Sequence, residues 1–480
     1  MFRASNLEYE HSDRVRGLAS GGIGAMHRLV RQIGLVGALD QHLQLLKVHL
    51  PYHESDHVLN VAYNILCGGT CLQDLELRRQ DEVYLDALGA QRIPDPTTAG
   101  DFCRRFDEPA IDALQTAINE TRVRVWQQQP AAFFDEAIID ADGTLAETTG
   151  ECKEGMDIAY NGVWGYHPLV VSLANTGEPL YLVNRSGNRP SSEGAAERFD
   201  QAAALCREAG FRRVTFRGDT DFMQTPHLDR WDEAGVRFVF GYDARTNLIA
   251  VADGLADTAW TPLVRRPAYE VQTEPRQRPA NVKAATIVQR EFKNLRLEAE
   301  AVAEFPYRPT ACAKPYRMIV VRKNISVEQG EHRLIDQIRY FFYLTNDHET
   351  ASDEVVFLAN DRCNQENLID QLKHGVGATR MPVDTLLSNW AYMVMAALAR
   401  TLKAWFALLL PETGRWATRY AAEKAAVLRM EFKAFLHAFM LIPVQVVRTG
   451  RRLVFRLLAW NPWQAVFLRG FDHMREPLRC

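Results

Sequence analysis

Two aspartates, Asp140 and Asp142, close a short apolar run that begins near Phe133. The run has the length of a buried strand, in which side chains two residues apart leave the sheet on the same side. Two carboxylates brought together repel each other and lose hydration, so a fold tolerates them best with a cation or a proton between them. The pair therefore indicates a metal site, or alternatively the end of a strand and a cap for the next element.

A second acidic pair, Asp219 and Asp221, follows a predicted strand over 214–218 and repeats the spacing of the first pair. Functional groups in an α/β layer collect at the carboxyl ends of strands. The second pair is therefore a further source of oxygen ligands for a cation.

A predicted helix, 354 to about 374, carries three charged residues at regular spacing. Arg362 and Glu366 are four residues apart and Lys373 is seven residues further on, so all three share one helix face. Alone, such a trio is most often a solvated salt-bridge ladder. Together with two strand-end acids, Glu366 completes the ligand set of a two-metal phosphoryl-transfer site, for which Mg²⁺, or Mn²⁺ in its place, is the expected cofactor.

Strands and helices alternate around the acidic pairs, which predicts an α/β layer. The expected strands are 137–140, 169–173, 180–183, 214–222 and 236–240, with helices over 192–209 and 222–234. Residues 18 to about 130 show helical periodicity. Residues 244 to about 345 are rich in proline, arginine and short β-type runs, which indicates an inserted strand-rich subdomain, and a long apolar helix is expected over 384–410.

The composition is that of an ordinary soluble globular protein, and 480 residues are enough for about three compact units. Residues 415–480 contain 12 Lys and Arg and 4 Asp and Glu. This excess of positive charge can bind the phosphates of a nucleic acid. The most apolar stretch is interrupted by Arg400 and Lys403, the first residues lack a secretory signal, and the eight cysteines are scattered. A cytoplasmic protein that does not cross a membrane is expected.

A helix expected over 99–106 follows a turn at 94–98 and carries Arg104 and Arg105. Short helices that include an arginine-bearing member can form a DNA-contacting module. The alternative is a plain helical domain with a solvated basic face.

Three motifs in order resemble those of bacterial insertion-sequence DDE transposases. They are Asp142-Gly143-Thr144, Arg217-Gly218-Asp219-Thr220-Asp221 and Arg362-x3-Glu366-x6-Lys373. The last motif resembles the branch with a Tyr-x2-Arg-x3-Glu-x6-Lys signature. Gly165-Tyr166-His167-Pro168-Leu169 and the hairpin at Gly177 further resemble insertion-sequence family thirteen-eighty. The resemblance covers about 137–405.

The resemblance implies a ribonuclease-H-like fold in which Asp142, Asp219 and Glu366 hold the catalytic metals. It also implies that Arg362 and Lys373 contact DNA phosphates beside the cleavage point.

Within each acidic pair, one residue matches the family better. Asp142 is preferred to Asp140 because the family's acid precedes a threonine by two residues, and Asp219 is preferred to Asp221 because the acid follows an arginine by two. Asp140 and Asp221 are second choices. The position of the family's tyrosine is occupied by Ala359 in this sequence. Any contact that the tyrosine side chain makes in the family is therefore not made by the residue at this position.

Five regions are expected on this basis. They are a helical N-terminal DNA-binding domain (1–130), the first part of the catalytic core (131–243), a β-rich insertion (244–345), the second part of the core with the Glu helix (346–410) and a helical basic C-terminal region (411–480).

The expected function is a cut-and-paste transposase that binds the terminal inverted repeats of its element, cleaves them and joins the 3′ hydroxyls to target DNA. We expect it to act as a homodimer on double-stranded DNA, in the bacterial cytoplasm and associated with the nucleoid. The alternatives are a metal-dependent nuclease of the same fold and a transposase-derived DNA-binding regulator that has lost its chemistry. A glycosidase is remote, because it gives no role to Arg362, Lys373 or the basic tail.

Overall fold

The computed structural model describes residues 15–265, 282–329, 332–450, 452–458, 461–474 and 478, with the side chains of 332–336 left aside. The start of the predicted N-terminal domain, the arginine- and proline-rich part of the predicted insertion (266–281) and several residues of the basic tail lie outside the described residues.

A nine-stranded mixed sheet runs through the protein in the order β10-β11-β12-β13-β9-β8-β2-β6-β7. Within it, β2 (Ala137–Gly143) pairs parallel with β8 (Val214–Gly218) and antiparallel with β6 (Leu169–Leu173). Strand β9 (Arg237–Tyr242) continues the parallel side and β7 (Glu178–Val183) the antiparallel side. The expected mixed α/β architecture is therefore confirmed.

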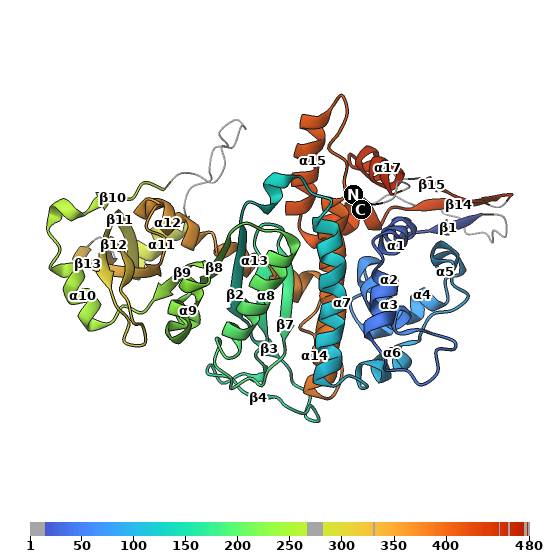
Figure 1. The fold of residues 1–480 in the computed structure, drawn as a ribbon, viewed down its shortest axis with the longest axis horizontal. Helices are drawn as coiled ribbons and strands as arrows, with labels where there is room; N and C mark the ends of the chain where they lie inside the picture. Colours follow the sequence, from blue (N-terminus) through green and yellow to red (C-terminus); the bar gives the residue numbers. More distant parts are fainter. Residues whose placement is uncertain are drawn as a thin grey trace.

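The remaining strands of this sheet come from the 244–345 region. They are β10 (Thr261–Pro262), β11 (Lys293–Tyr307), β12 (Tyr316–Gln329) and β13 (His332–Thr345). Strand β13 pairs antiparallel with β9, so these strands extend the main sheet instead of forming a second one. Figure 1 shows them at one end of the molecule, opposite the N-terminal helices.

Helices cover both faces of the central strands. Helix α8 (Ala195–Ala209) lies on the face of Phe216, whose ring centroid is 4.5 Å from that of Phe199. The next residue along β8, Arg217, points to the opposite face and donates to the Leu358 carbonyl, which lies between β13 and the long helix α14 in the chain. The acidic residues of β2 share this second face, because side chains alternate along a strand.

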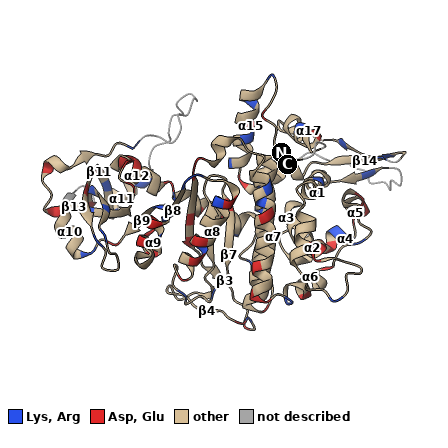
Figure 2. Cartoon of the chain, viewed as in Figure 1, with Lys and Arg blue, Asp and Glu red and all other residues tan. Residues whose placement is uncertain are grey.

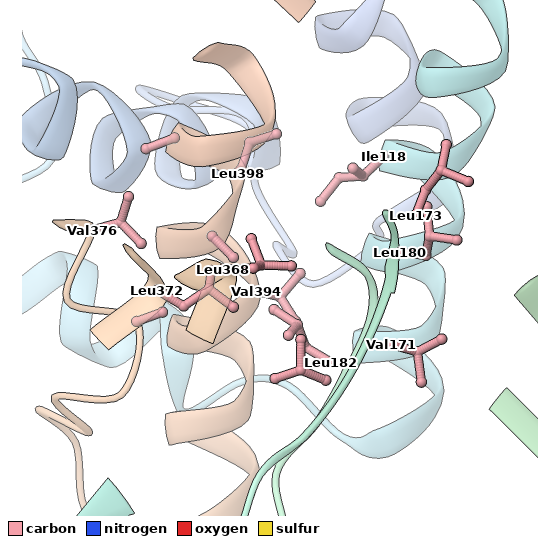
Figure 3. Close-up of a cluster of buried hydrophobic side chains, with 14 of the residues drawn as sticks. Ile118, Val171, Leu173, Leu180, Leu182, Leu368, Leu372, Val376, Val394 and Leu398 are labelled. Atoms are coloured by element: carbon pink, nitrogen blue, oxygen red, sulfur yellow. The ribbon is translucent and has the colours of Figure 1, made fainter. Parts of the chain in front are cut away.

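Helix α14 (Leu386–Leu408) is the core helix of the protein and packs against α3, α7, α15 and β7. It is long and apolar enough by composition to cross a membrane, yet every residue of its most apolar window is buried inside the protein. Figure 3 shows Val394 of α14 in one cluster with Leu182 of β7 and with Leu368 and Leu372, from the segment that precedes α14 in the chain.

The predicted continuous helix over 354–374 is wrong. The chain forms α12 (Ser352–Asn360), α13 (Cys363–Asp370) and a π-helical turn, η6 (Gln371–Gly375). At the break, the Leu358 carbonyl accepts a hydrogen bond from Arg217, and the Arg362 amide turns to the Ala359 carbonyl instead. A side chain from a distant strand therefore interrupts the helical hydrogen bonds, which periodicity within the segment cannot reveal.

The first part of the chain is mainly helical. Its helices are α1 (Ile23–Gln32), α2 (Leu35–His42), α3 (Glu54–Leu66), α4 (Leu75–Arg79), α5 (Glu82–Leu88), α6 (Pro96–Cys103) and α7 (Glu108–Trp126). Four of them, α1, α3, α6 and α7, pack against α14. Asp95 and Asp107 accept hydrogen bonds from backbone amides at the starts of α6 and α7, as N-caps do.

The C-terminal region, expected to be helical, also contains strands. Besides α15 (Ala417–Arg429), α16 (Phe432–Phe435) and α17 (Gln464–His473), this region contains a hairpin of β14 (Val444–Thr449) and β15 (Arg452–Leu457). Its β-branched alternation favours strands, and β1 (Arg16–Leu18) completes a three-stranded sheet by pairing with β14. Figure 2 shows Lys and Arg on α15 and along β14.

The other short elements connect these layers. They are β3 (Ala146–Glu147), β4 (Asp157–Ile158) and β5 (Trp164–Tyr166), which form a small sheet, and the helices α9 (Leu228–Glu233), α10 (Thr246–Asp253) and α11 (Val282–Gln289).

Candidate active site

Asp142 and Asp219 lie at the carboxyl ends of the adjacent parallel strands β2 and β8, and one arginine joins them. Arg362 Nη1 is 2.9 Å from Asp142 Oδ2, and Arg362 Nη2 is 3.5 Å from Asp219 Oδ2. The side chains of Asp142 and Arg362 are each 16% exposed. The structure therefore brings together two of the predicted acids and one of the predicted cations.

Burial makes both carboxyl groups harder to ionise. It raises the pKa of Asp142 to about 6, and the nearby Asp219 adds to the shift, although Arg362 opposes it. Burial also raises the pKa of Asp219. A single guanidinium does not fully compensate the two carboxylates, so the pair keeps an excess of negative charge.

Asp140 points to the same side of β2 but has a partner of its own. Arg217 Nε and Nη2 each lie 2.7 Å from one oxygen of Asp140, and both side chains are almost fully buried. The two residues are direct neighbours in the parallel pairing of β2 and β8. Asp140, the second choice in the first pair, is therefore engaged in a bidentate ion pair.

Asp221, the second choice in the other pair, is exposed. Its backbone amide donates to Asp219 Oδ1 at 3.0 Å, so Asp219 caps the short 3-10 turn η3 (Thr220–Phe222). This bond fixes one oxygen of Asp219 and leaves the other facing Arg362.

Glu366 lies one helical turn after Arg362, on α13, and is exposed. Among the described residues it makes no hydrogen bond or ion pair. Within the described ranges, no three His, Cys, Asp or Glu side chains are grouped so that they could hold a metal ion. The structure thus does not gather Glu366 with Asp142 and Asp219 in this conformation.

Lys373 is half-buried in the π-helical turn that follows α13. Burial lowers the pKa of its ammonium group, and the carboxylates of Asp370 and Asp142 oppose this shift. Lys373 therefore lies within electrostatic reach of Asp142.

Gln365 holds α13 against the sheet, and sequence reasoning missed it. Its side chain accepts from the Ser172 hydroxyl and donates to the Val170 carbonyl at 3.1 Å, both on β6. Because Gln365 directly precedes Glu366, these bonds fix the start of α13 relative to β2. A buried amide between two polar neighbours, Asn364 and Glu366, has no sequence signal of its own.

Two further residues near the acids were also missed. The pairing of Asp140 with Arg217 could have been found by aligning the two predicted parallel strands, since the residues occupy the same register position. His167 lies in the Gly165–Leu169 stretch and is buried; a Cβ on Gly143 would come within 2.8 Å of its Nε2. Gly143 therefore allows this ring to approach the backbone beside Asp142.

The predicted DNA-contacting arginines of the N-terminal region are found at the end of α6. Arg104 Nε is 2.9 Å from Asp384, and its Nη1 is 2.9 Å from Asp101, so it ties α6 to the start of the core helix. Arg105 is exposed. Ala359 lies on α12 and packs against a small hydrophobic cluster that includes Val355 and Tyr343.

The donor set suits a hard divalent cation, because carboxylate oxygens are the ligands that Mg²⁺ and Mn²⁺ prefer. Asp142 and Asp219 already converge, and Glu366 lies on the helix that carries their arginine partner. The geometry supports metal-assisted chemistry on a phosphodiester more than any reaction that needs a nucleophilic cysteine or serine.

Residues 17–477 match the family model described as transposase DDE domain group 1. The chain therefore belongs to this family of DDE transposases, whose members generally use divalent metal ions and act on DNA. A solved structure entitled "Cryo-EM structure of piggyBac transposase synaptic complex with hairpin DNA (SNHP)" is similar over 88% of this chain and 79% of its own, with 11% identity and a TM-score of 0.39. Among curated proteins, none matches.

Proposed function

We propose that this transposase binds the terminal inverted repeats of an insertion sequence, cleaves the DNA at their ends and transfers the 3′ ends to target DNA. The convergence of Asp142, Asp219 and Arg362 at the carboxyl ends of β2 and β8 carries the proposal. Two partly buried carboxylates and a guanidinium are what a site for a metal-bound phosphodiester requires.

The order of the central strands supports a ribonuclease-H-like core. Strands β7, β6 and β2 are antiparallel, and β8 and β9 then continue parallel to β2 on its other side. In this proposal the core comprises 131–243 and 346–410, the β-rich insertion is 244–345, and the flanks 1–130 and 411–480 contribute to DNA binding.

Asp142, Asp219 and Glu366 would hold the divalent cations, Mg²⁺ or Mn²⁺, which supply a polarised water or 3′ hydroxyl and neutralise charge on the leaving oxygen. Arg217 holds Asp140 away from the metals and fixes the strand that bears Asp142. Arg362 and Lys373 would bind the phosphates that flank the scissile bond, for which the planar guanidinium of Arg362 suits two oxygens at once.

Cleavage and joining at two ends favour a homodimer on double-stranded DNA, in which each protomer acts on one end. Arg105, exposed beside α6, is the better candidate for a DNA contact in the N-terminal region, because Arg104 is occupied by two carboxylates. In this proposal the protein works in the bacterial cytoplasm, in association with the nucleoid.

The test is a cleavage assay. The protein is incubated with Mg²⁺ and duplex DNA that carries the repeats flanking its gene, and nicks are mapped at nucleotide resolution. We expect the wild-type protein to nick the DNA at the repeat ends. Asp142→Asn or Glu366→Gln should lower the cleavage rate by at least about 1,000-fold, roughly the scale of removing a key catalytic group. Both variants should still bind the DNA.

Two other outcomes would replace the proposal. Nicking without any joined product would favour a metal-dependent nuclease of the same fold. Repeat binding without metal-dependent nicking would favour a DNA-binding regulator.

A further inference from the structure

The guanidinium of Arg362 fills the space between the two carboxylates of the proposed metal site. It donates to Asp142 at 2.9 Å and reaches Asp219 at 3.5 Å. Asp140 offers no alternative acceptor, because Arg217 occupies both of its oxygens. Arg362 is therefore the counter-ion of this pair of acids in the protein without DNA.

A divalent cation and this guanidinium compete for the same oxygens. Mg²⁺ requires carboxylate oxygens at about 2.0–2.1 Å, and Asp142 Oδ2 already accepts a hydrogen bond from Arg362. A cation bound there would stand a few ångströms from a positive charge, at a distance where like charges in a partly buried site repel strongly. The two cannot occupy this position together.

The position of Arg362 allows its side chain to turn away from the two aspartates. It is the N-cap residue of α13, directly after the break between α12 and α13, and its side chain is partly exposed. The phosphates of DNA would offer it a bidentate partner of higher charge density. Lys373, which lies within electrostatic reach of Asp142, would help to hold such a phosphate.

We propose that Arg362 blocks the metal site of the free protein and leaves it for a DNA phosphate, so that DNA and divalent metal bind cooperatively. This inference rests on the proposed function, since it takes Asp142 and Asp219 as metal ligands. Because coupling between two ligands is reciprocal, DNA strengthens metal binding by the same factor by which metal strengthens DNA binding. The active centre is then completed on DNA.

The first measurement is the affinity for Mn²⁺ without DNA, read from the signal of free Mn²⁺ in electron paramagnetic resonance. Wild type is compared with Arg362→Gln and with Lys373→Gln, which removes the same charge nearby without emptying the space between the acids. We expect Arg362→Gln to bind Mn²⁺ about tenfold more tightly than wild type, the scale of one charge-assisted contact, and Lys373→Gln to change the affinity much less.

Asp142→Asn separates the two hypotheses. If this variant loses Mn²⁺ binding while Arg362→Gln binds like wild type or more weakly, the blocking role is overturned and the metal site stands. If Asp142→Asn binds Mn²⁺ like wild type, the metal-site assignment, and with it the proposed function, is overturned. Thermal unfolding of each variant checks that the fold is retained.

A second measurement does not depend on the folding of Arg362→Gln. Binding of a fluorescently labelled short duplex is followed by anisotropy with Mn²⁺ and with a chelator, for wild type and for Asp142→Asn. For each protein we compare the DNA affinity with Mn²⁺ and with the chelator. The factor by which Mn²⁺ raises this affinity should be about tenfold larger for wild type than for Asp142→Asn, in line with typical coupling between sites. Equal effects on both proteins would overturn the cooperative coupling.

Discussion

Asp140 and Asp142 stand two residues apart on one strand, yet their surroundings give them different roles. Asp140 is buried in a bidentate pair with Arg217, whereas Asp142 is partly exposed and shares Arg362 with Asp219. A buried, fully paired carboxylate stabilises a fold, and a partly compensated one at a strand end is available to a ligand.

This difference predicts unequal effects of the two residues on stability. Asp140→Ala leaves the buried guanidinium of Arg217 without a partner and should lower the free energy of unfolding by about 3–5 kcal/mol. Asp142→Asn should change it by less than about 1 kcal/mol, because a neutral side chain removes the cost of a poorly compensated charge. Urea unfolding followed by tryptophan fluorescence measures both. Equal losses would contradict the assignment of roles.

The sequence alone indicated which residue types form the site, but not all of their partners. The strand-end positions of Asp142 and Asp219 follow from alternation and from the α/β pattern. The bond between Arg217 and the Leu358 carbonyl, which divides the predicted helix before Arg362, joins residues far apart in the chain. Periodicity within one segment carries no information about such a contact.

Among the elements, α13 is the one that carries Glu366, and Gln365 fixes this helix to β6. Gln365→Leu removes both hydrogen bonds to β6 and leaves the buried Ser172 hydroxyl without its acceptor. We expect a loss of about 1–3 kcal/mol in the free energy of unfolding and a larger proportional loss of cleavage rate.

The exposed neighbour gives the matched control for this prediction. Asn364→Leu alters the same turn of α13 outside the sheet contact and should leave the stability and the cleavage rate nearly unchanged. If both variants behave alike, Gln365 does not position the helix.

Helices α3 and α6 meet through His57, which makes their packing sensitive to acid. The ring stacks on Phe102 with centroids 4.3 Å apart, and burial lowers the pKa of His57 to about 4. Above pH 6.5 the imidazole is neutral in both the folded and the unfolded chain. Between about pH 6.5 and 4 only the unfolded chain takes up the proton, so stability falls as the pH falls through this window.

We expect His57→Phe to remove this loss, which amounts to at most about 3 kcal/mol at pH 4. Thermal unfolding at pH 7 and pH 4.5 measures it, with His348→Phe, a change at an exposed histidine, as the control. An unchanged difference between the two pH values in His57→Phe would show that the acid sensitivity arises elsewhere.

At the scale of the whole molecule, Glu178 links the catalytic sheet to two long helices. Its carboxylate on β7 accepts from Arg122 and Trp126 of α7, from Trp405 of α14 and from the hydroxyl of Thr176. All of these groups except the threonine come from distant parts of the chain. The sequence predicted the helices and the strand separately, but it gave no sign of the carboxylate that joins them.

Glu178→Gln should destabilise the protein by about 3–5 kcal/mol, because it leaves the buried Arg122 without a charged partner. Glu193→Gln, the same change in the surface ion pair with Arg189, should lower the free energy of unfolding by less than about 1 kcal/mol. Urea unfolding compares the two variants. A similar small effect for both would mean that the cluster does not hold the helices to the sheet.

The most direct test of the central claim is anomalous diffraction from crystals of the protein bound to DNA of its flanking repeats and Mn²⁺. We expect anomalous peaks between the carboxylates of Asp142, Asp219 and Glu366. The guanidinium of Arg362 should be withdrawn from both aspartates and bound to a DNA phosphate. Crystals that contain DNA and Mn²⁺ but show no peak at these residues, or a peak that Glu366 does not contact, would contradict it.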